Sequence, residues 1–515
     1  MTSHFKFYPG SEEVVIPWNA RYSFPSQANK AIKTTPRIPP KNGETFTPGQ
    51  TIRFEFPAQG YVNTANTTIV FDCDILNTNP SATNSNQLAT WMQNNIQSVF
   101  NRGRILYGAN PIEDILQYNQ IVRNLTEWTS SNNNNFDQFT INEGIGRIVI
   151  APAAAVPKLQ HARLKYIHSS SGTGTGVRNV PIASPAATNN NGARRRYQIQ
   201  LLFGLLTQGK LLPTKFMASQ LAIELTLEQA AACMIYDATY FSTGTPGTAT
   251  ATYQLTNLAL IPEIFEFDAA YDALFLKGLQ DGGVPIKFNK WHTYVYTLPA
   301  SQIANIMIPE RSRSVKALFS IIRNSTSTLA TDSGATYSST NNTTALLSYQ
   351  YRIGGRYFPA SPVQVNYNTT GAFSTGCTEA YLELQKALNM VGDYRLSCAV
   401  NAASWGVPFG NHQARDGTVG LDYGAAGAYT ATALTTTLTG FDMPAVDNTG
   451  TFCMAICLET TNGAEISGLN AEEQSDISLM VNWNGVQDAG YQIETYVLYD
   501  ALLVLKPNNV MELIE

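Results

Sequence analysis

The sequence predicts an all-β protein built from two tandem β-sandwiches of similar architecture. Two apolar, β-prone stretches lead to this expectation: residues 253–268 at the midpoint (YQLTNLALIPEIFEFD) and residues 491–505 near the end (YQIETYVLYDALLVL). Both begin with Tyr-Gln followed by Leu or Ile, and each comes after a long series of other strand-like segments. We therefore expect each stretch to be the last, buried strand of a domain, so that the chain holds two copies of one β-architecture.

Two further pairs of segments recur in the same order. In each half one segment alternates large apolar residues with smaller or polar ones, as a half-buried strand does: Leu221, Ile223, Leu225 and Leu227 in the first, and Ile477, Leu479, Val481 and Trp483 in the second. A Gly-Arg pair also lies in a strand-like run of each half, at Gly103 and Arg104 (SVFNRGRILYG) and at Gly355 and Arg356 (YQYRIGGRYFP). The offsets are all roughly 240 to 260 residues, as a duplicated domain requires.

The composition suits a β-rich protein whose surfaces are covered by neighbours. Only 14% of the 515 residues are charged, and Asn, Thr, Ser, Gly and Tyr are abundant. The net charge of −5 gives no general attraction to nucleic acid or to an anionic membrane. No apolar run reaches the roughly 18 residues of a membrane span, and the first residues lack the apolar core of a signal peptide, so we expect synthesis in the cytosol.

Residues 1–45 are predicted to form an extended arm. Their prolines exclude a packed helix or a central strand, and basic residues are spaced along the segment. Two interpretations stay open, a disordered tail or an arm that orders on a neighbouring subunit or on a layer beneath. The second is favoured by aromatic side chains that a disordered tail does not need: Phe5, Phe7, Tyr8, Trp18, Tyr22 and Phe24.

From Thr51 onwards the chain reads as strands separated by polar loops, with three helical segments. The first strands alternate with one apolar face each: Ile52, Phe54 and Phe56, then Ile69, Phe71, Cys73 and Ile75. We expect a helix over residues 111–124, capped by Asn110 with Pro111 in its first turn. A matching helix is expected over residues 378–391, capped by Thr378 and ended by Gly392. A further helical segment, residues 269–279, follows the midpoint strand.

These elements divide the chain into an arm (1–45), a first sandwich (46–268), a linking helix and loop (269–289) and a second sandwich (290–515). Long polar segments inside the sandwiches predict surface projections or loops that clasp neighbouring subunits, because structureless loops beyond about 15 residues are rare without a use. These segments are residues 130–135, 169–196, 243–252, 325–344 and 416–450.

We expect no catalytic, cofactor-binding or metal-binding residues, and no enzyme activity. The Gly-rich run 169–176 lacks the Lys-Ser/Thr of a phosphate-binding loop, and His161 and His168 have no carboxylate between them. The basic cluster of Arg194, Arg195 and Arg196 is either a solvated loop end or a contact with an acidic patch on a neighbour, and both interpretations stay open. The cysteines lack zinc-site spacing and are expected to be buried thiols: Cys73, Cys233, Cys377, Cys398, Cys453 and Cys457.

Two runs resemble the double jelly-roll major capsid proteins of the tailless-phage and adenovirus lineage, most closely those of virophages and polinton-like viruses. They are SVFNRGRILYGANPIEDI (98–115) and LLFGLLTQGKLLPTKFMASQLAIELTLE (201–228). The Gly…Leu-Leu-Pro cadence of the second run, followed by alternating apolar residues, is typical of a first jelly roll in that family. The resemblance covers about residues 50–515. The second half shows no obvious counterpart of LLFGLLTQGKLLP around Trp405, which leaves the strand assignment there open.

The resemblance implies two jelly rolls, each with a short inserted helix, in a major capsid protein of the virion. Three copies are then expected to form a capsomer of pseudo-hexagonal outline, and capsomers to tile an icosahedral shell around double-stranded DNA. The implied partners are the other subunits of a homotrimer, neighbouring capsomers and minor capsid or penton proteins, with a membrane or a cement protein reached by the arm. No sequence-specific contact with nucleic acid and no cofactor is implied.

Two other classes of protein stay as alternatives. A trimeric viral spike or vertex protein would share the β-rich loops without needing the duplication. A carbohydrate-binding β-sandwich would need exposed aromatic side chains beside paired carboxylates, drawn from Trp91, Trp128, Trp291, Trp405 and Trp483. The alternation around Trp483 assigns that side chain to the core and speaks against the carbohydrate-binding class.

Overall fold

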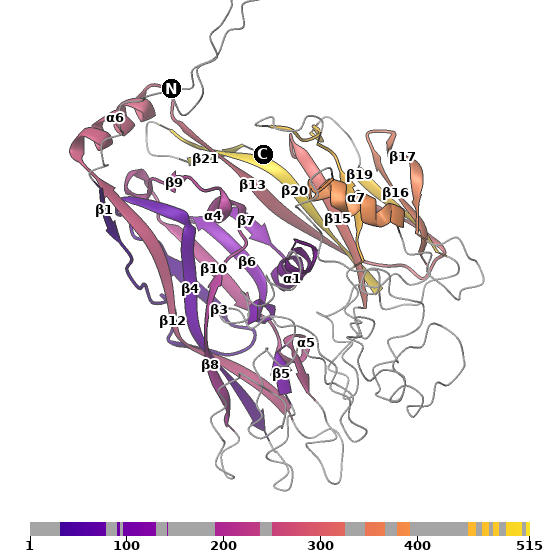
Figure 1. The fold of residues 1–515 in the computed structure, drawn as a ribbon, viewed down its shortest axis with the longest axis horizontal. Coiled ribbons are helices and arrows are strands. Elements are labelled where there is room, and N and C mark those ends of the chain that lie inside the picture. Colours follow the sequence, from indigo (N-terminus) through magenta and orange to yellow (C-terminus); the bar gives the residue numbers. More distant parts are fainter. Residues whose placement is uncertain are drawn as a thin grey trace, which may run out of the picture.

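Antiparallel sheets arranged as two sandwiches side by side make up the described part of the chain (Figure 1). The structure is a computed structural model, and it describes residues 31–78, 90–92, 96–129, 142, 191–236, 250–324, 346–365, 378–391, 452–459, 466–472, 477–483, 491–506 and 511–514. The first half runs from strand β1 (Ala31–Thr34) to strand β12 (Thr250–Phe267), and the second half from β13 (Val284–Thr297) to β21 (Met511–Ile514).

Each half has two main sheets. In the first half, one sheet has the order β1, β12, β4 (Tyr61–Thr78), β8 (Asn191–Gln200), with short strands β2 (Thr45–Phe46) and β9 (Leu211–Leu212) beside it. The other has the order β3 (Thr51–Glu55), β10 (Leu221–Leu227), β6 (Phe100–Tyr107), β7 (Asn110–Ile115). A separate two-stranded ribbon pairs β5 (Thr90–Met92) with β11 (Met234–Tyr236).

The second half repeats this arrangement. One sheet has the order β13, β20 (Tyr491–Leu505), β15 (Val315–Asn324), β18 (Met454–Cys457), and β21 pairs with β20. The other has the order β14 (Ile303–Ile308), β19 (Ile477–Trp483), β16 (Leu346–Ile353), β17 (Arg356–Gln364).

The two halves have the same strand order, element for element. In chain order, β1, β3, β4, β6, β7, β8, β10 and β12 match β13, β14, β15, β16, β17, β18, β19 and β20. In both halves the first, eighth, third and sixth of these strands form one sheet, and the second, seventh, fourth and fifth form the other. This is the jelly-roll arrangement of two sheets, so the all-β class and the duplication are confirmed.

The core lies between the two sheets of each half, where the alternating sequence patterns predict it. The apolar residues of β10 and β3 are all buried, and so are Ile477, Leu479, Val481 and Trp483 of β19. The midpoint and C-terminal stretches are β12 and β20, each the eighth strand of its jelly roll and each flanked by neighbours on both sides. The alternation of apolar residues in the sequence therefore predicted correctly which side of each of these strands faces the core.

The first predicted helix is wrong over its first turns. Residues 110–115 form β7, and helix α1 (Tyr118–Thr129) begins only at Tyr118. Gly108, with a φ of +61°, lies in the tight turn that folds β7 back onto β6, so that Ile112 and Ile115 are buried in the sandwich. The same spacing of apolar residues fits a helix or a strand, and the hairpin pairing decides for the strand.

The other predicted helices are confirmed with shifted ends. Helix α7 (Thr378–Ala387) is shorter than residues 378–391, and Asn389 beyond it has a left-handed φ of +55°. Helix α6 (Ala269–Gln280) begins after Asp268, whose side chain accepts a hydrogen bond from the Tyr271 backbone N–H (3.0 Å). Shorter helical turns are α4 (Gly204–Thr207), α5 (Ala230–Cys233), η2 (Ile96–Val99) and η3 (Thr214–Phe216).

The structure also bears on the Gly-Arg pairs, the N-terminal arm and the linker. The Gly-Arg echo is wrong, because Gly103 lies inside β6 whereas Gly355, with a φ of +83°, lies in the turn between β16 and β17. The last part of the arm, β1, pairs with β12 of its own chain, and β13 begins inside the expected linker 269–289. The domain boundaries themselves stay a prediction.

The predicted long polar segments lie largely outside the described residues. The exceptions are residues 191–196, which belong to β8, and residues 250–252, which belong to β12. No helix in the described ranges is long and apolar enough to cross a membrane.

Candidate interaction surfaces

One side of the first half packs against a sheet of the second half, and Figure 1 shows α1 lying between them. Trp128 of α1 is fully buried and stacks on Phe319 of β15, with ring centroids 5.7 Å apart. Trp291 of β13 contacts the same Phe319 ring at 5.8 Å. The next residue of β15, Ser320, instead accepts from Tyr351 inside the second sandwich (2.8 Å), so Phe319 is on the outer face of its sheet.

A buried polar cluster lies on the same outer face. Arg323 of β15 and Glu494 of β20 form an ion pair in which both side chains are fully buried. Tyr496 donates to Glu494 (2.8 Å), while Arg323 and Tyr496 each donate to Gln117, in the turn before α1, at 3.4 Å. Because a buried charge has lost its hydration, removing any one of these partners is costly. The cluster therefore fixes how the two halves meet.

Glu113 of β7 is fully buried at this junction. Its Oε1 accepts the backbone N–H groups of Gly204 (3.1 Å) and Trp291 (3.4 Å), whereas its Oε2 has no hydrogen-bond partner among the described residues. Burial raises the pKa of Glu113 from 4.5 to about 7, against the opposing effect of the backbone hydrogen bonds and of Lys290. The backbones also touch, because a Cβ on Gly204 would lie 1.3 Å from the carbonyl oxygen of Asn289 in β13.

The matching side of the second half is exposed. Most of α1 is buried, residues 118–124 completely so, but α7 buries only Ala380 and Leu384 and leaves Leu382 44% exposed. Strand β7 buries half of its residues, whereas β17 buries Val363 and leaves Tyr357 46% exposed. Elements at the same point in the two strand orders thus differ in burial: α1 and β7 are covered by the other half of the chain, whereas α7 packs on β18 and β15 of its own half and β17 is mostly exposed.

The outer face of the matching sheet in the first half is also exposed, along its edge strand β8. Residues 194, 196, 198 and 200 alternate along that edge as Arg, Arg, Gln and Gln, all exposed. In the second half the equivalent sheet is the one covered by α1 and β7. The internal contact joins β7 and α1 to the outer face of a sheet. The chain has a second copy of each of these two surfaces, namely β17 with α7 and the outer face along β8, and both copies are exposed.

The arginine cluster that begins β8 is paired within the chain. Arg196 binds Asp72 of β4 through two hydrogen bonds (2.7 and 3.2 Å), and Arg194 lies 3.5 Å from Asp72 and from Asp74. Burial acts to raise the pKa of Asp72, but hydrogen bonds from Arg196 and Asn257 and the charges of both arginines lower it overall. The loop-end interpretation is corrected, because these residues belong to a strand, and the acidic partners of Arg194 and Arg196 within the chain are on the neighbouring strand. A contact of the cluster with a neighbouring subunit stays a prediction.

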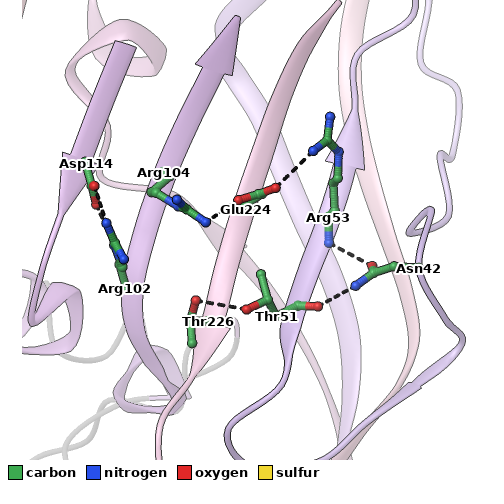
Figure 2. Close-up of polar contacts among 8 residues, drawn as sticks. All are labelled: Asn42, Thr51, Arg53, Arg102, Arg104, Asp114, Glu224 and Thr226. Carbon is green, nitrogen blue, oxygen red and sulfur yellow. Dashed lines mark hydrogen bonds and ion pairs between the residues drawn. The ribbon is translucent and has the colours of Figure 1, made fainter. Parts of the chain in front are cut away.

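A ladder of polar contacts crosses the outer face of the β3-β10-β6-β7 sheet, as Figure 2 shows. Glu224 of β10 binds Arg104 of β6 (2.6 Å) on one side and Arg53 of β3 (3.0 Å) on the other, and Arg102 binds Asp114 of β7. Asn42 covers the free edge of β3 by bonding the Arg53 backbone N–H (3.0 Å). Opposite charges on adjacent strands satisfy one another here, which leaves this face little charge for a partner.

The same face of the second half has a different character. Its edge strand β14 leaves Ile303 64% and Met307 59% exposed, and both point away from the core, which Ile306 and Ile308 enter. The two jelly rolls are therefore alike in topology and unlike in the chemistry of their outer faces.

The structure describes only some of the cysteine, histidine and tryptophan residues that the sequence analysis singled out. Cys73, Cys233 and Cys453 are buried free thiols and Cys457 is a partly buried one, whereas Cys377 and Cys398 lie outside the described residues. His161, His168 and Trp405 also lie outside them. Within the described ranges no group of histidine, cysteine or carboxylate side chains is arranged to hold a metal ion. Trp128, Trp291 and Trp483 are buried, Trp483 in the core as predicted.

Sequence reasoning missed the buried junction of Glu113, Arg323 and Glu494. A partial signal was present, since each is a charged residue in a largely apolar strand segment that holds one other charge (NPIEDI, VKALFSIIRN and YQIETYVLYD). A charged side chain in a segment of that kind needs a buried partner. The identity of the partner comes from the fold, because the three residues are far apart in the sequence.

Comparison with known proteins supports the fold through solved structures alone. No protein-family model matches the sequence, and no curated protein is similar to it. The chain superposes on VP54 of PBCV-1, in a structure fitted into a reconstruction of the virophage Sputnik, with a TM-score of 0.52, 10% identity and coverage of 96% of this chain and 99% of that one.

Two further capsid proteins give the same result. The Faustovirus major capsid protein has a TM-score of 0.52 at 8% identity, covering 96% of this chain and 92% of its own. The mavirus major capsid protein has a TM-score of 0.50 at 9% identity, covering 99% and 95%. At this level of identity the likeness speaks for the fold, over nearly the whole length of both chains. By its strand order and by this likeness, the chain has the double jelly-roll fold.

Proposed function

We propose that the chain is the major capsid protein of an icosahedral double-stranded DNA virus, and that three copies form a capsomer of pseudo-hexagonal outline. The observation that carries the proposal is the contrast between the covered junction inside the chain and its uncovered duplicate. The elements β7 and α1 are buried against the outer face of the β13-β20-β15 sheet. Their counterparts β17 and α7 are exposed.

These exposed surfaces become covered if the contact made inside one chain is made again between two chains. If β17 and α7 of one copy meet the outer face of the β1-β12-β4-β8 sheet of the next, each jelly roll contacts its neighbours as the two halves of one chain do. A heterologous contact of this kind either closes into a ring or grows without end. A ring of three chains holds six jelly rolls, which is the outline that a hexagonal lattice of capsomers needs.

The remaining features of the proposal follow from this role. The other partners are neighbouring capsomers and minor capsid or penton proteins, and the protein acts in the virion as a structural component and not as an enzyme. A low charged fraction suits such assembly, because few ions lose their hydration when surfaces close. The solved structures of similar fold support the proposal, since the Faustovirus and mavirus proteins are major capsid proteins.

Light scattering on the purified protein tests the proposal. A subunit contact of well over about 1,000 Å² makes the free monomer scarce, so the expected mass is three times that of the chain. Electron microscopy of the same sample should show rings of hexagonal outline. A stable monomer at micromolar concentration would overturn the trimer.

Two variants locate the contact. Leu382→Glu places a charge on the exposed face of α7 and should shift the trimer towards monomer without unfolding the chain, because Leu382 is 44% exposed. Met307→Glu makes the same kind of change on β14, outside the proposed contact, and should leave the mass unchanged. Dissociation by Met307→Glu alone would place the subunit contact on the other sheet.

A further inference from the structure

Helix α6, which connects the two halves, is apolar on nearly every side and yet exposed. Its sequence is AAYDALFLKGLQ, in which Asp272 and Lys277 are the charged residues. Leu279 is its buried residue, whereas Leu274 is 68% exposed, Tyr271 40% and Leu276 39%. A helix that is apolar all round is normally buried, so a surface of this kind requires a cover.

The underside of α6 is already occupied. Phe275 stacks on Phe216 with ring centroids 5.1 Å apart, and Tyr61 contacts Phe275 edge-on at 5.6 Å. Asp272 accepts from Tyr61 (3.0 Å) and binds Lys215 (2.5 Å). These contacts fix the position of the helix. Tyr271 and Leu274 are exposed on one side of its buried stripe and Leu276 on the other, so a cover has to cross the helix.

The N-terminal segment reaches the chain's folded part beside this surface. Ala31, the first residue of β1, pairs with Phe267 of β12, and α6 begins two residues later, at Ala269. Residues 1–30 thus join the fold at the beginning of α6. A dozen extended residues span far more than the roughly 18 Å length of a twelve-residue helix, so the segment can follow all of α6.

The composition of residues 1–30 fits an apolar surface. The segment carries six of the chain's large aromatic side chains, at positions 5, 7, 8, 18, 22 and 24, and it also contains the apolar run VVIP at residues 14–17. Attachment beside the surface also gives the segment a high effective concentration there, which a free partner lacks.

We propose that residues 1–30 pack across the exposed face of α6 in the same chain and cover Tyr271, Leu274 and Leu276. The segment is an intramolecular cover for the apolar connection between the two jelly rolls. This docking is separate from the proposed subunit contact, which uses α7 and β17.

Limited proteolysis of the full chain tests the docking. Trypsin sites within the segment follow Lys6, Arg21 and Lys30, and cleavage of a docked segment is limited by the fraction undocked. Leu274→Glu removes one apolar contact and should speed cleavage after Arg21 by about tenfold. The matched control Gln280→Glu adds the same charge at an exposed polar position of α6 and should leave the rate within about twofold of the parent.

The outcomes separate the alternatives. Fast cleavage after Arg21 in the parent protein, unchanged by Leu274→Glu, overturns the proposal. Protection that rises with protein concentration also overturns it, since an intramolecular contact is independent of concentration, and it would assign α6 to the segment of a second copy. Thermal unfolding of each variant shows whether α6 and the sandwiches remain folded, and Leu276→Glu repeats the test at a second position if Leu274→Glu does not fold.

Discussion

Trp128 of α1 stacks on Phe319 of β15 with an interplanar angle of 21°, so that the aromatic core of the molecule runs across the junction between its halves. Trp291 of β13 also contacts the Phe319 ring, at a tilt of 44°. The two jelly rolls therefore share a packed contact and do not simply follow one another along the chain.

Replacing Trp128 with alanine should reduce the free energy of unfolding by about 3 to 5 kcal/mol, because it empties a large buried site. Phe319→Ala should cost a similar amount. In the double variant the two losses should fall short of additivity by about 0.5 to 1.5 kcal/mol, the coupling expected of a stacked aromatic pair. Urea denaturation of the four proteins measures this coupling, and strict additivity would show that the rings do not interact.

Gly204→Ala should be severely destabilising, by about 3 kcal/mol or more, because the new methyl group cannot occupy the same space as the Asn289 carbonyl oxygen. Gly278→Ala in α6 is the matched control. Nothing lies within 4 Å of its Cβ position, and alanine favours a helix over glycine by up to about 1 kcal/mol. The melting temperatures of the two variants should move in opposite directions, and a neutral Gly204→Ala would contradict the close approach of α4 to β13.

Glu113 should make stability depend on pH. Its pKa is raised from 4.5 in the unfolded chain to about 7 in the folded one, so the folded state holds a proton more tightly. The stabilising contribution is complete below about pH 4.5 and is lost as the pH rises through about 7, a loss of roughly 3 kcal/mol.

Glu113→Gln removes this titration and keeps an oxygen for the Gly204 and Trp291 N–H groups. The difference in unfolding free energy between variant and parent should therefore grow in favour of the variant from pH 5 to pH 8. Chemical denaturation at several pH values measures it. Parallel curves for the two proteins would mean that Glu113 does not titrate in this range.

Leu225→Ala should cost about 2 to 5 kcal/mol, since Leu225 is fully buried in β10. Glu224→Ala, one residue away on the outer face, breaks ion pairs to Arg53 and Arg104 that are partly exposed to solvent. Pairs of this kind contribute about 1 kcal/mol or less each, so the loss should be clearly smaller. Equal losses in denaturant would contradict the assignment of the two faces of β10.

The local sequence pattern was sufficient to predict a strand and its inward face where one side of the strand is buried and the other is not. The alternation in β10 and β19 predicted both the strands and their inward faces, and the similar stretches of β12 and β20 revealed the duplication. It failed at residues 110–115, where Ile112, Ile115 and Leu116 fit a helical stripe as well as a strand. There the hairpin with β6 and burial of Glu113 against the second half decide the outcome, and both are tertiary contacts.

The interaction surfaces could be predicted only in part. Charged residues in apolar segments indicate that a buried partner exists, but Arg323 and Glu494 are 171 residues apart in the chain. Likewise, the exposed arginines of β8 and the acidic residues of β4 are separated by more than a hundred residues and meet through sheet pairing. Such pairings depend on strand order, which the local sequence does not encode.

Strand β20 is synthesised after β13, β15 and β18, yet it lies between β13 and β15 inside their sheet. On the ribosome, the first jelly roll is therefore complete in sequence long before the second can form. Until residues 491–505 emerge, β13 and β15 have no strand to join them, and β7 and α1 have no finished face to meet. A prematurely terminated chain would expose apolar surface from both halves and would be prone to aggregation. Synthesis of residues 491–505 is thus the step that allows the second jelly roll to close.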